Sequence, residues 1–251
     1  MAARAADSPS AGGRTRRSRR RRIGLGLGGT LVVILLYVVL AGWVSKALSA
    51  EDVQAIAMLR VDAPCGERSG FAGEVRCIRA VQAAVLAIAP DQTCAERGEP
   101  IEPMPFIRRG HGCCFDRARF IEKALEHYGY TTRRVALYER GRGYLGLLVA
   151  GIDSHAASEV RTARGWLGVD SEQPFILITR AGRPVRYDQY HALPPGALVQ
   201  RPTQRHSFGF ARPFFSIAGL YSRHGKAHGP DLPAPEINYP DFFRYAVLGL
   251  D

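Results

Sequence analysis

The stretch that most constrains the fold is residues 110–128, GHGCCFDRARFIEKALEHY. Apolar side chains recur at helical spacing from Phe115 onward, and Gly129 follows as a C-terminal stop signal. The adjacent Cys113 and Cys114 therefore lie at or just before the N-terminus of an amphipathic helix. Backbone N–H groups are unpaired at that end of a helix, and the helix dipole is positive there. A cysteine in this position has a lowered pKa and is a better nucleophile.

A thiolate nucleophile needs a base that pairs with it and a group that orients the base. Downstream, His155 and Asp170 are candidates for these two roles, and each lies in a short run typical of a β-strand. If residues 162–165 form the loop between the two strands, Arg161 faces Trp166. Because side chains alternate along a strand, His155 then becomes a diagonal neighbour of Asp170, within reach of a hydrogen bond. A register shift of one residue would abolish this arrangement.

The order of the remaining elements indicates the fold class. Helices are predicted at 51–60 and 75–88, before the central helix, and further strands at 131–138, 144–150 and 175–179. Residues 91–110 and the chain from about Pro194 onward are predicted to be loops. Helices followed by consecutive antiparallel strands are typical of an α+β fold.

The positive charge is concentrated at the N-terminus. Of the formal net charge of +11, residues 1–22 carry +7 from eight arginines and one aspartate, which leaves +4 for the rest of the chain. We interpret this tail as the disordered cytoplasmic flank of a membrane segment, and expect no nucleic-acid partner.

That membrane segment is residues 23–44, which contain no charged side chain. As a helix they would span about 33 Å, enough for a bilayer core. The arginines precede the span and only Lys46 closely follows it, which predicts a cytoplasmic N-terminus. We therefore expect a single-pass protein of a bacterial inner (plasma) membrane, with residues 45–251 forming an extracytoplasmic, periplasmic domain whose core lies at about 75–180.

A cleaved signal peptide is the competing interpretation. Residues 47–49, Ala-Leu-Ser, are an acceptable cleavage site, and Arg19-Arg20 is a weak twin-arginine-like pattern. The apolar stretch nevertheless exceeds the ~7–15 residues usual for a signal peptide, which favours an uncleaved anchor.

The chain has five cysteines, an odd number that suggests one free thiol in an exported domain. If Cys114 is that thiol, the others can form up to two disulfides in three possible connectivities; they are Cys65, Cys77, Cys94 and Cys113.

A zinc site built from Cys113, Cys114, His111 and Cys94 is an alternative, but no compact ligand spacing supports it. We therefore predict no metal. The histidines other than His155 have no partner pattern and are expected at the surface; they are His111, His127, His191, His206, His224 and His228.

These residues resemble the core of the transglutaminase-like superfamily, whose fold is papain-like. The family motif Gly-x-Cys-x-Asp at a helix start is similar to residues 112–116, GCCFD, and this register makes Cys114 rather than Cys113 the nucleophile. His-Ala-Trp-x-Glu-Val is similar to residues 155–160, HAASEV, and Trp-x-x-hydrophobic-Asp-Pro to residues 166–171, WLGVDS. A Gly-hydrophobic-x-x-Arg-hydrophobic segment is similar to residues 129–135.

Two positions depart from the family pattern. Ala157 replaces a tryptophan, which removes an aromatic wall near the site, and Ser171 replaces a proline. No upstream residue is an evident oxyanion-hole donor, although the backbone N–H of Cys114 can supply one.

The resemblance implies a Cys114-His155-Asp170 triad on a helix packed against an antiparallel sheet. It further implies a cysteine-dependent amide hydrolase or acyltransferase that acts on a protein or peptide carboxamide through a thioester, with hydrolysis expected over cross-linking. No cofactor is expected. The alternative is a catalytically inert scaffold of this fold that serves as a membrane-anchored binding or assembly module.

Overall fold

The computed structural model describes residues 28–37, 39–40, 42–66, 69–96, 99–141, 153–221 and 236–250. The chain divides into two compact units, Met1–Ala41 and Gly42–Asp251. In the first unit, residues 28–37 and 39–40 are helical.

Among the described residues, no helix combines the length and the apolar character that crossing a bilayer requires. Residues 1–27, which include the basic tail and the start of the predicted membrane segment, lie outside the described part of the chain. The predicted strand at 144–150 lies outside it as well.

The second unit begins with the helices α2 (Ala50–Ala57), α3 (Asp62–Gly66), α4 (Gly70–Ile88), α5 (Pro103–Arg109) and α6 (Cys114–His127). Ser49 caps α2, because its Oγ accepts the Asp52 N–H at 3.1 Å while the Asp52 carboxylate accepts the Ser49 N–H at 2.8 Å. The central helix is confirmed as α6, and α4 begins five residues earlier than the apolar stripe predicts.

The prediction of a loop throughout residues 91–110 is wrong, because α5 forms there. Pro103 occupies its first turn, and Gly110, with φ of 71°, ends it. The helix is held by tertiary packing, since the Phe106 ring meets the Phe120 ring of α6 edge-on at 5.7 Å between centroids. Seven residues are too few to show a helical period in sequence.

An antiparallel sheet of four strands follows, in the order β3-β2-β1-β4. The strands are β1 (Thr132–Glu139), β2 (Ser154–Thr162), β3 (Gly165–Val169) and β4 (Phe214–Ala218). Arg161 pairs with Trp166 between β2 and β3, which confirms the predicted register. The prediction of a strand at 175–179 is wrong, because these residues form only isolated bridges.

The prediction that the chain is loop-like after Pro194 is also wrong in part. β4 pairs with β1, and near the C-terminus α7 (Tyr239–Asp241) continues into the π-helix η3 (Phe242–Val247). The 3-10 helix η2 (Tyr187–Ala192) lies between β3 and β4 in the chain. Sequence periodicity misses β4 because pairing with β1, almost 80 positions earlier, stabilises it.

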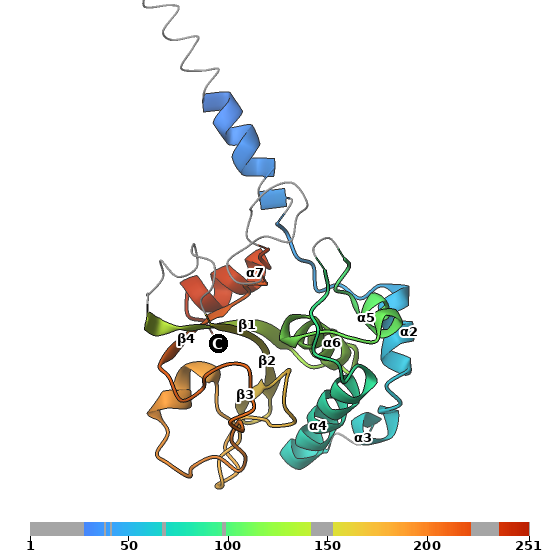
Figure 1. The fold of residues 1–251 in the computed structure, drawn as a ribbon, viewed down its shortest axis with the longest axis vertical. Coiled ribbons are helices and arrows are strands. Elements are labelled where there is room, and N and C mark those ends of the chain that lie inside the picture. The colour runs from blue at the N-terminus through green and yellow to red at the C-terminus, as the bar shows by residue number, and fades with distance from the viewer. Residues whose placement is uncertain are drawn as a thin grey trace, which may run out of the picture. The chain divides into compact units, whose positions relative to one another are not determined.

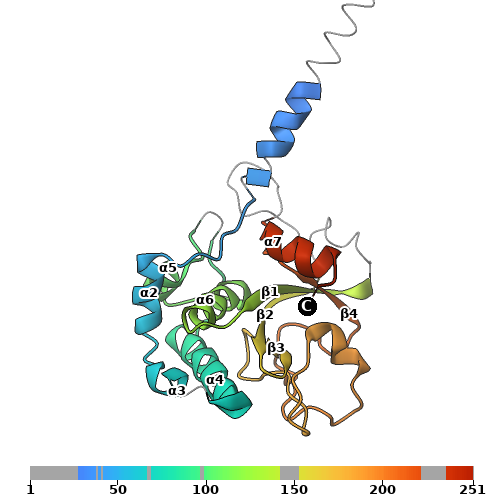
Figure 2. The ribbon, with the colours of Figure 1, turned by 180° about the vertical axis from the view of Figure 1, so that it is seen from behind.

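The structure of the second unit is therefore α+β with an antiparallel sheet. Figure 1 and Figure 2 show α2 to α6 gathered together beside β1 and β2, with η2 and its flanking loops apart from them. Helix α6 packs on β2, where the Ser158 hydroxyl donates to the Ala118 carbonyl at 3.2 Å. Val135, Leu137 and Ala157 pack instead against the aromatic residues of the segment after β3.

Candidate active site

The start of α6 is fixed by buried polar contacts. Helix α6 begins at Cys114, with Cys113 as the capping residue. The Cys113 N–H donates to Asp116 Oδ2 at 3.0 Å, and Arg109 Nη2 donates to Asp116 Oδ1 at 3.2 Å. At Gly112, a Cβ would lie 2.4 Å from Phe106 Cε2 and 2.9 Å from the Asp116 Cβ, so no side chain fits there. Gly112 and Asp116 thus fix the start of the helix and, with it, the position of Cys114.

The cysteines divide as the odd count suggests. Disulfides join Cys65 to Cys77 and Cys94 to Cys113, and the partly exposed Cys114 keeps a free thiol. The zinc alternative at this place is thereby overturned, because the sulfurs of Cys94 and Cys113 are bonded to each other.

The hydrogen bond predicted between His155 and Asp170 is present. His155 Nε2 lies 2.8 Å from Asp170 Oδ2, and both side chains are fully buried. Nδ1 of His155 is buried too and has no hydrogen-bond partner in the described part of the chain. Since Nε2 is bonded to the carboxylate, Nδ1 is the nitrogen left to meet Cys114 or a substrate.

Backbone N–H groups that follow Asp170 in the chain hold its carboxylate in place. Its Oδ1 accepts the N–H groups of Glu172 at 2.8 Å and Gln173 at 2.7 Å. The buried Gln82 of α4 donates from Nε2 to the Asp170 carbonyl at 2.7 Å and to the Phe175 carbonyl at 2.8 Å. Sequence reasoning missed Gln82, whose only signal is a polar residue beside the apolar stripe of its helix.

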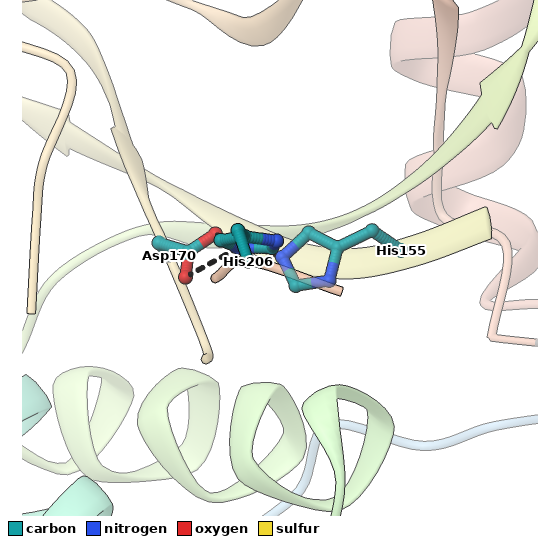
Figure 3. Close-up of side chains that lie close together, drawn as sticks. All are labelled: His155, Asp170 and His206. Atoms are coloured by element: carbon teal, nitrogen blue, oxygen red, sulfur yellow. Dashed lines mark hydrogen bonds and ion pairs between the residues drawn. The ribbon is translucent and has the colours of Figure 1, made fainter. Parts of the chain in front are cut away.

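The expectation that His206 lies at the surface is wrong. Its side chain is buried, and Nε2 lies 3.2 Å from each oxygen of Asp170. Figure 3 shows both histidine rings converging on that carboxylate. His206 Nδ1 accepts the Phe208 N–H at 3.0 Å, so Nε2 carries the proton and donates to Asp170.

His206 reaches the site on a loop that is tied to the turn after β3. Gln173 and Thr203 exchange two hydrogen bonds, of 3.0 and 2.9 Å. The Glu172 carboxylate accepts the Ser207 N–H at 2.7 Å and also its hydroxyl. These contacts join residues 30 or 35 positions apart. No local sequence motif could therefore predict the position of His206.

Aromatic side chains surround His155 although residue 157, where the similar motif has tryptophan, is alanine. The ring of Phe208 stacks on His155 at 5.9 Å between centroids, and Phe210 meets it edge-on at 5.9 Å. Ala157 packs in the same cluster as both phenylalanines. The aromatic wall expected to be missing is therefore supplied by the loop before β4. The other departure, Ser171, donates its hydroxyl to the Ala156 carbonyl.

Glu159, the glutamate of the segment similar to His-Ala-Trp-x-Glu-Val, has a structural role. It is buried, and its carboxylate pairs with Arg133 at 2.7 Å and accepts the Tyr187 N–H at 2.7 Å. It links β2 to β1 and to η2, and it does not line the cleft beside Cys114.

Electrostatics favour a charged thiolate–imidazolium pair. Burial raises the pKa of the Cys114 thiol, but the nearby His155, the Ala156 backbone and the charge of Arg134 outweigh it and lower that pKa. Burial lowers the pKa of His155, whereas Asp170 and Cys114 raise it to about 10. Burial likewise raises the pKa of Asp170, but the two histidines hold it well below its usual range.

The thiol opens onto a small cleft of about 50 Å³. Cys114, His155 and Arg134 line it together with residues of β1, β2 and the chain after β4. The candidate nucleophile and the candidate base therefore line the same cleft.

His155, Asp170 and His206 also form a group that could hold a metal ion. One donor atom from each lies within 4.8 Å of the others, and two imidazoles with a carboxylate suit zinc. In the structure both imidazoles are hydrogen-bonded to the Asp170 carboxylate. The same arrangement would serve a proton relay, so the three residues are compatible with either role.

A scan against protein-family models found no match for the chain, and a search of curated proteins found none either. The function is therefore inferred from the geometry of the site and from the sequence motifs.

Proposed function

We propose that the protein is a cysteine-dependent amide hydrolase or acyltransferase of the transglutaminase-like, papain-like type. The observation that carries the proposal is a free thiol at the first residue of α6, beside an imidazole that is bonded to a buried carboxylate at 2.8 Å. Nucleophile, base and orienting group are the three parts that acyl transfer requires. Substrates are protein or peptide carboxamides.

In the proposed reaction, the Cys114 thiolate attacks the carbonyl carbon and forms a C–S bond. The backbone N–H of Cys114, in the first turn of the helix, donates to the developing oxyanion. His155 then gives its Nδ1 proton to the leaving nitrogen as the C–N bond breaks, which leaves a thioester. Water or an amine attacks the thioester, His155 takes up a proton, and the thiolate is released.

Asp170 keeps Nε2 of His155 protonated and therefore turns Nδ1 toward the reacting atoms. Gln82 and His206 are positioning residues, because each acts on Asp170 and neither lines the cleft.

The arginine-rich tail and the uncharged residues 23–44 support a membrane-anchored protein whose second unit lies outside the cytoplasm. Two disulfides are consistent with that compartment, because cytosolic thiols are kept reduced.

Alkylation of the non-reduced protein tests the proposed nucleophile. Four of the five cysteines are in disulfides, so iodoacetamide should modify Cys114 alone. Labelling should persist at pH 6 and vanish in Cys114→Ser. The double variant Cys94→Ala/Cys113→Ala should keep it, at a cost of about 3 kcal/mol in stability from the lost disulfide.

A search for the acyl-enzyme then tests the reaction. The protein is incubated with a panel of peptide amides, and its Cys114 peptide is examined for an adduct that hydroxylamine removes, as it removes a thioester. Slow alkylation like that of a free cysteine, together with no adduct, would point to the inert scaffold instead.

A further inference from the structure

Arg134 is a buried cation whose charge helps lower the pKa of the Cys114 thiol but which takes part in no bond-making or proton-transfer step of the proposed reaction. It lies on β1 opposite Ser158, and its side chain is inaccessible to solvent. Its Nη2 donates to the Phe115 carbonyl at 2.8 Å. Nε and Nη1 are buried and have no hydrogen-bond partner within the described ranges. Leaving such donors unpaired is costly, so their position in the fold needs a reason.

Two aromatic rings contact the Arg134 guanidinium, and within the described residues no carboxylate forms an ion pair with it. The Phe115 ring lies 4.7 Å and the Tyr221 ring 5.2 Å from the guanidinium carbon. Both rings attract a cation through their faces but accept no ordinary hydrogen bond. The nearby Glu122 is engaged elsewhere, since its oxygens bond Arg119 and the Tyr221 hydroxyl.

The preceding residue gives the contrast. Arg133 is buried to a similar degree, yet its guanidinium bonds Glu159 from Nε at 2.8 Å and from Nη2 at 2.7 Å. Arg133 does not line the cleft, whereas Arg134 lines it beside Cys114 and His155. The arginine that faces the nucleophile is thus the one left without a carboxylate.

We propose that Arg134 binds a carboxylate of the substrate, so that the enzyme selects amides with an acidic group close to the scissile carbonyl. This inference rests on the proposed function for the identity of the reacting thiol. Arginine suits the task because it stays charged and presents several N–H donors to the two oxygens of a carboxylate. Arg134 and Cys114 line the same cleft, so a carboxylate near Arg134 and the reacting carbonyl can belong to one substrate.

Two alkylating reagents of nearly equal size test the proposal on the protein as it stands. Iodoacetate carries a carboxylate, and iodoacetamide carries a neutral amide in its place. Both report the same thiolate, so the ratio of their rate constants cancels any effect of a variant on the pKa of Cys114. Relative to a free thiol, the wild-type ratio should favour iodoacetate by about tenfold or more. Iodoacetate labelling should also saturate and be slowed by acetate.

Arg134→Gln should lower the ratio several-fold toward that of a free thiol, because the His155 imidazolium remains, and Arg134→Lys should keep part of the preference that Arg134 gives. Arg161→Gln is the control, because it removes the same charge from an exposed position on β2. An unchanged ratio in Arg134→Gln, or iodoacetate labelling that neither saturates nor responds to acetate, would overturn the proposal.

A second measurement covers the cases in which Arg134→Gln does not fold or Cys114 reacts with neither reagent. In the wild-type protein labelled with ¹⁵N-arginine, the Nε–H resonance absent from Arg134→Lys is followed during titration with acetate. A saturable shift supports a carboxylate site even if the proposed function fails. A resonance that does not move refutes the site whatever the chemistry of the thiol.

Discussion

Nε2 of His155 lies 2.8 Å from Oδ2 of Asp170, although the two residues are 15 positions apart in the chain. The distance follows from the β2–β3 turn, in which Thr162 pairs with Gly165. Each step back along β2 is matched by a step forward along β3, until the histidine and the aspartate meet diagonally just beyond the last pair. One hairpin therefore carries both the proposed base and its proposed orienting group.

Asp170→Asn should lower the rate of amide hydrolysis by roughly 10²–10⁴-fold. The neutral asparagine side chain no longer stabilises the imidazolium of His155, and it favours the wrong tautomer of that ring. The measurement is turnover with whichever peptide amide acylates Cys114, alongside the thermal midpoint. Full activity in this variant would mean that another group orients His155. Unfolding without a separate catalytic loss would favour a structural role for Asp170.

The pH dependence should have two limits. Because the pKa of Cys114 is lowered, its thiolate persists below the usual range, and alkylation should change little between pH 8 and pH 6. A free cysteine with a pKa near 8.5 slows roughly 10²-fold over that interval. In His155→Ala, burial acts on the thiol without the imidazole to oppose it, so the steep dependence should return.

The proposed hydrolysis needs protonated His155, whose pKa is raised to about 10. Activity should therefore hold through neutral pH and fall as the pH rises through about 10, while alkylation of the thiolate continues there. A loss of hydrolysis already near pH 7 would contradict the strong pairing with Asp170.

His206→Ala should reduce turnover by about tenfold, since Asp170 loses one of its donors but keeps the backbone N–H groups of Glu172 and Gln173. The pH at which alkylation declines on the acid side should rise, because the carboxylate is less stabilised and supports His155 less. Unchanged turnover would mean that His206 contributes only to packing.

Zinc content measured in the purified wild type and in His206→Ala separates a proton relay from a metal site.

Gly112→Ala should destabilise the domain by about 1–3 kcal/mol, because its Cβ would overlap the buried Phe106 ring. Gly141→Ala is the matched control, as a Cβ at Gly141 meets nothing within 4 Å. Chemical denaturation measures both. Equal stability of the two variants would show that the chain before α6 gives way without cost.

The location can be tested by fusing a reporter that is active only in the cytoplasm after Asp251. We expect it to be silent, because the arginines precede the uncharged span and hold the N-terminus inside. Strong reporter activity would reverse the proposed topology.

The sequence alone determined the parts of the site that depend on short-range geometry. Helical period and a stop glycine placed Cys114 at the start of α6, and strand alternation across a loop predicted at 162–165 placed His155 beside Asp170. The register is as predicted, although the loop is two residues shorter because Thr162 pairs with Gly165. Both placements follow from local periods of 3.6 and 2 residues, which a single chain displays without its partners.

Only the tertiary structure decided the rest. Gln82 and His206 reach Asp170 from positions 88 and 36 residues away, and the two disulfides were chosen from three connectivities. The burial of Arg134 and its two nitrogens without hydrogen-bond partners are known only from the tertiary structure. Such contacts arise from packing between distant segments, and packing leaves no period in the sequence because the chain length between partners is unrestricted.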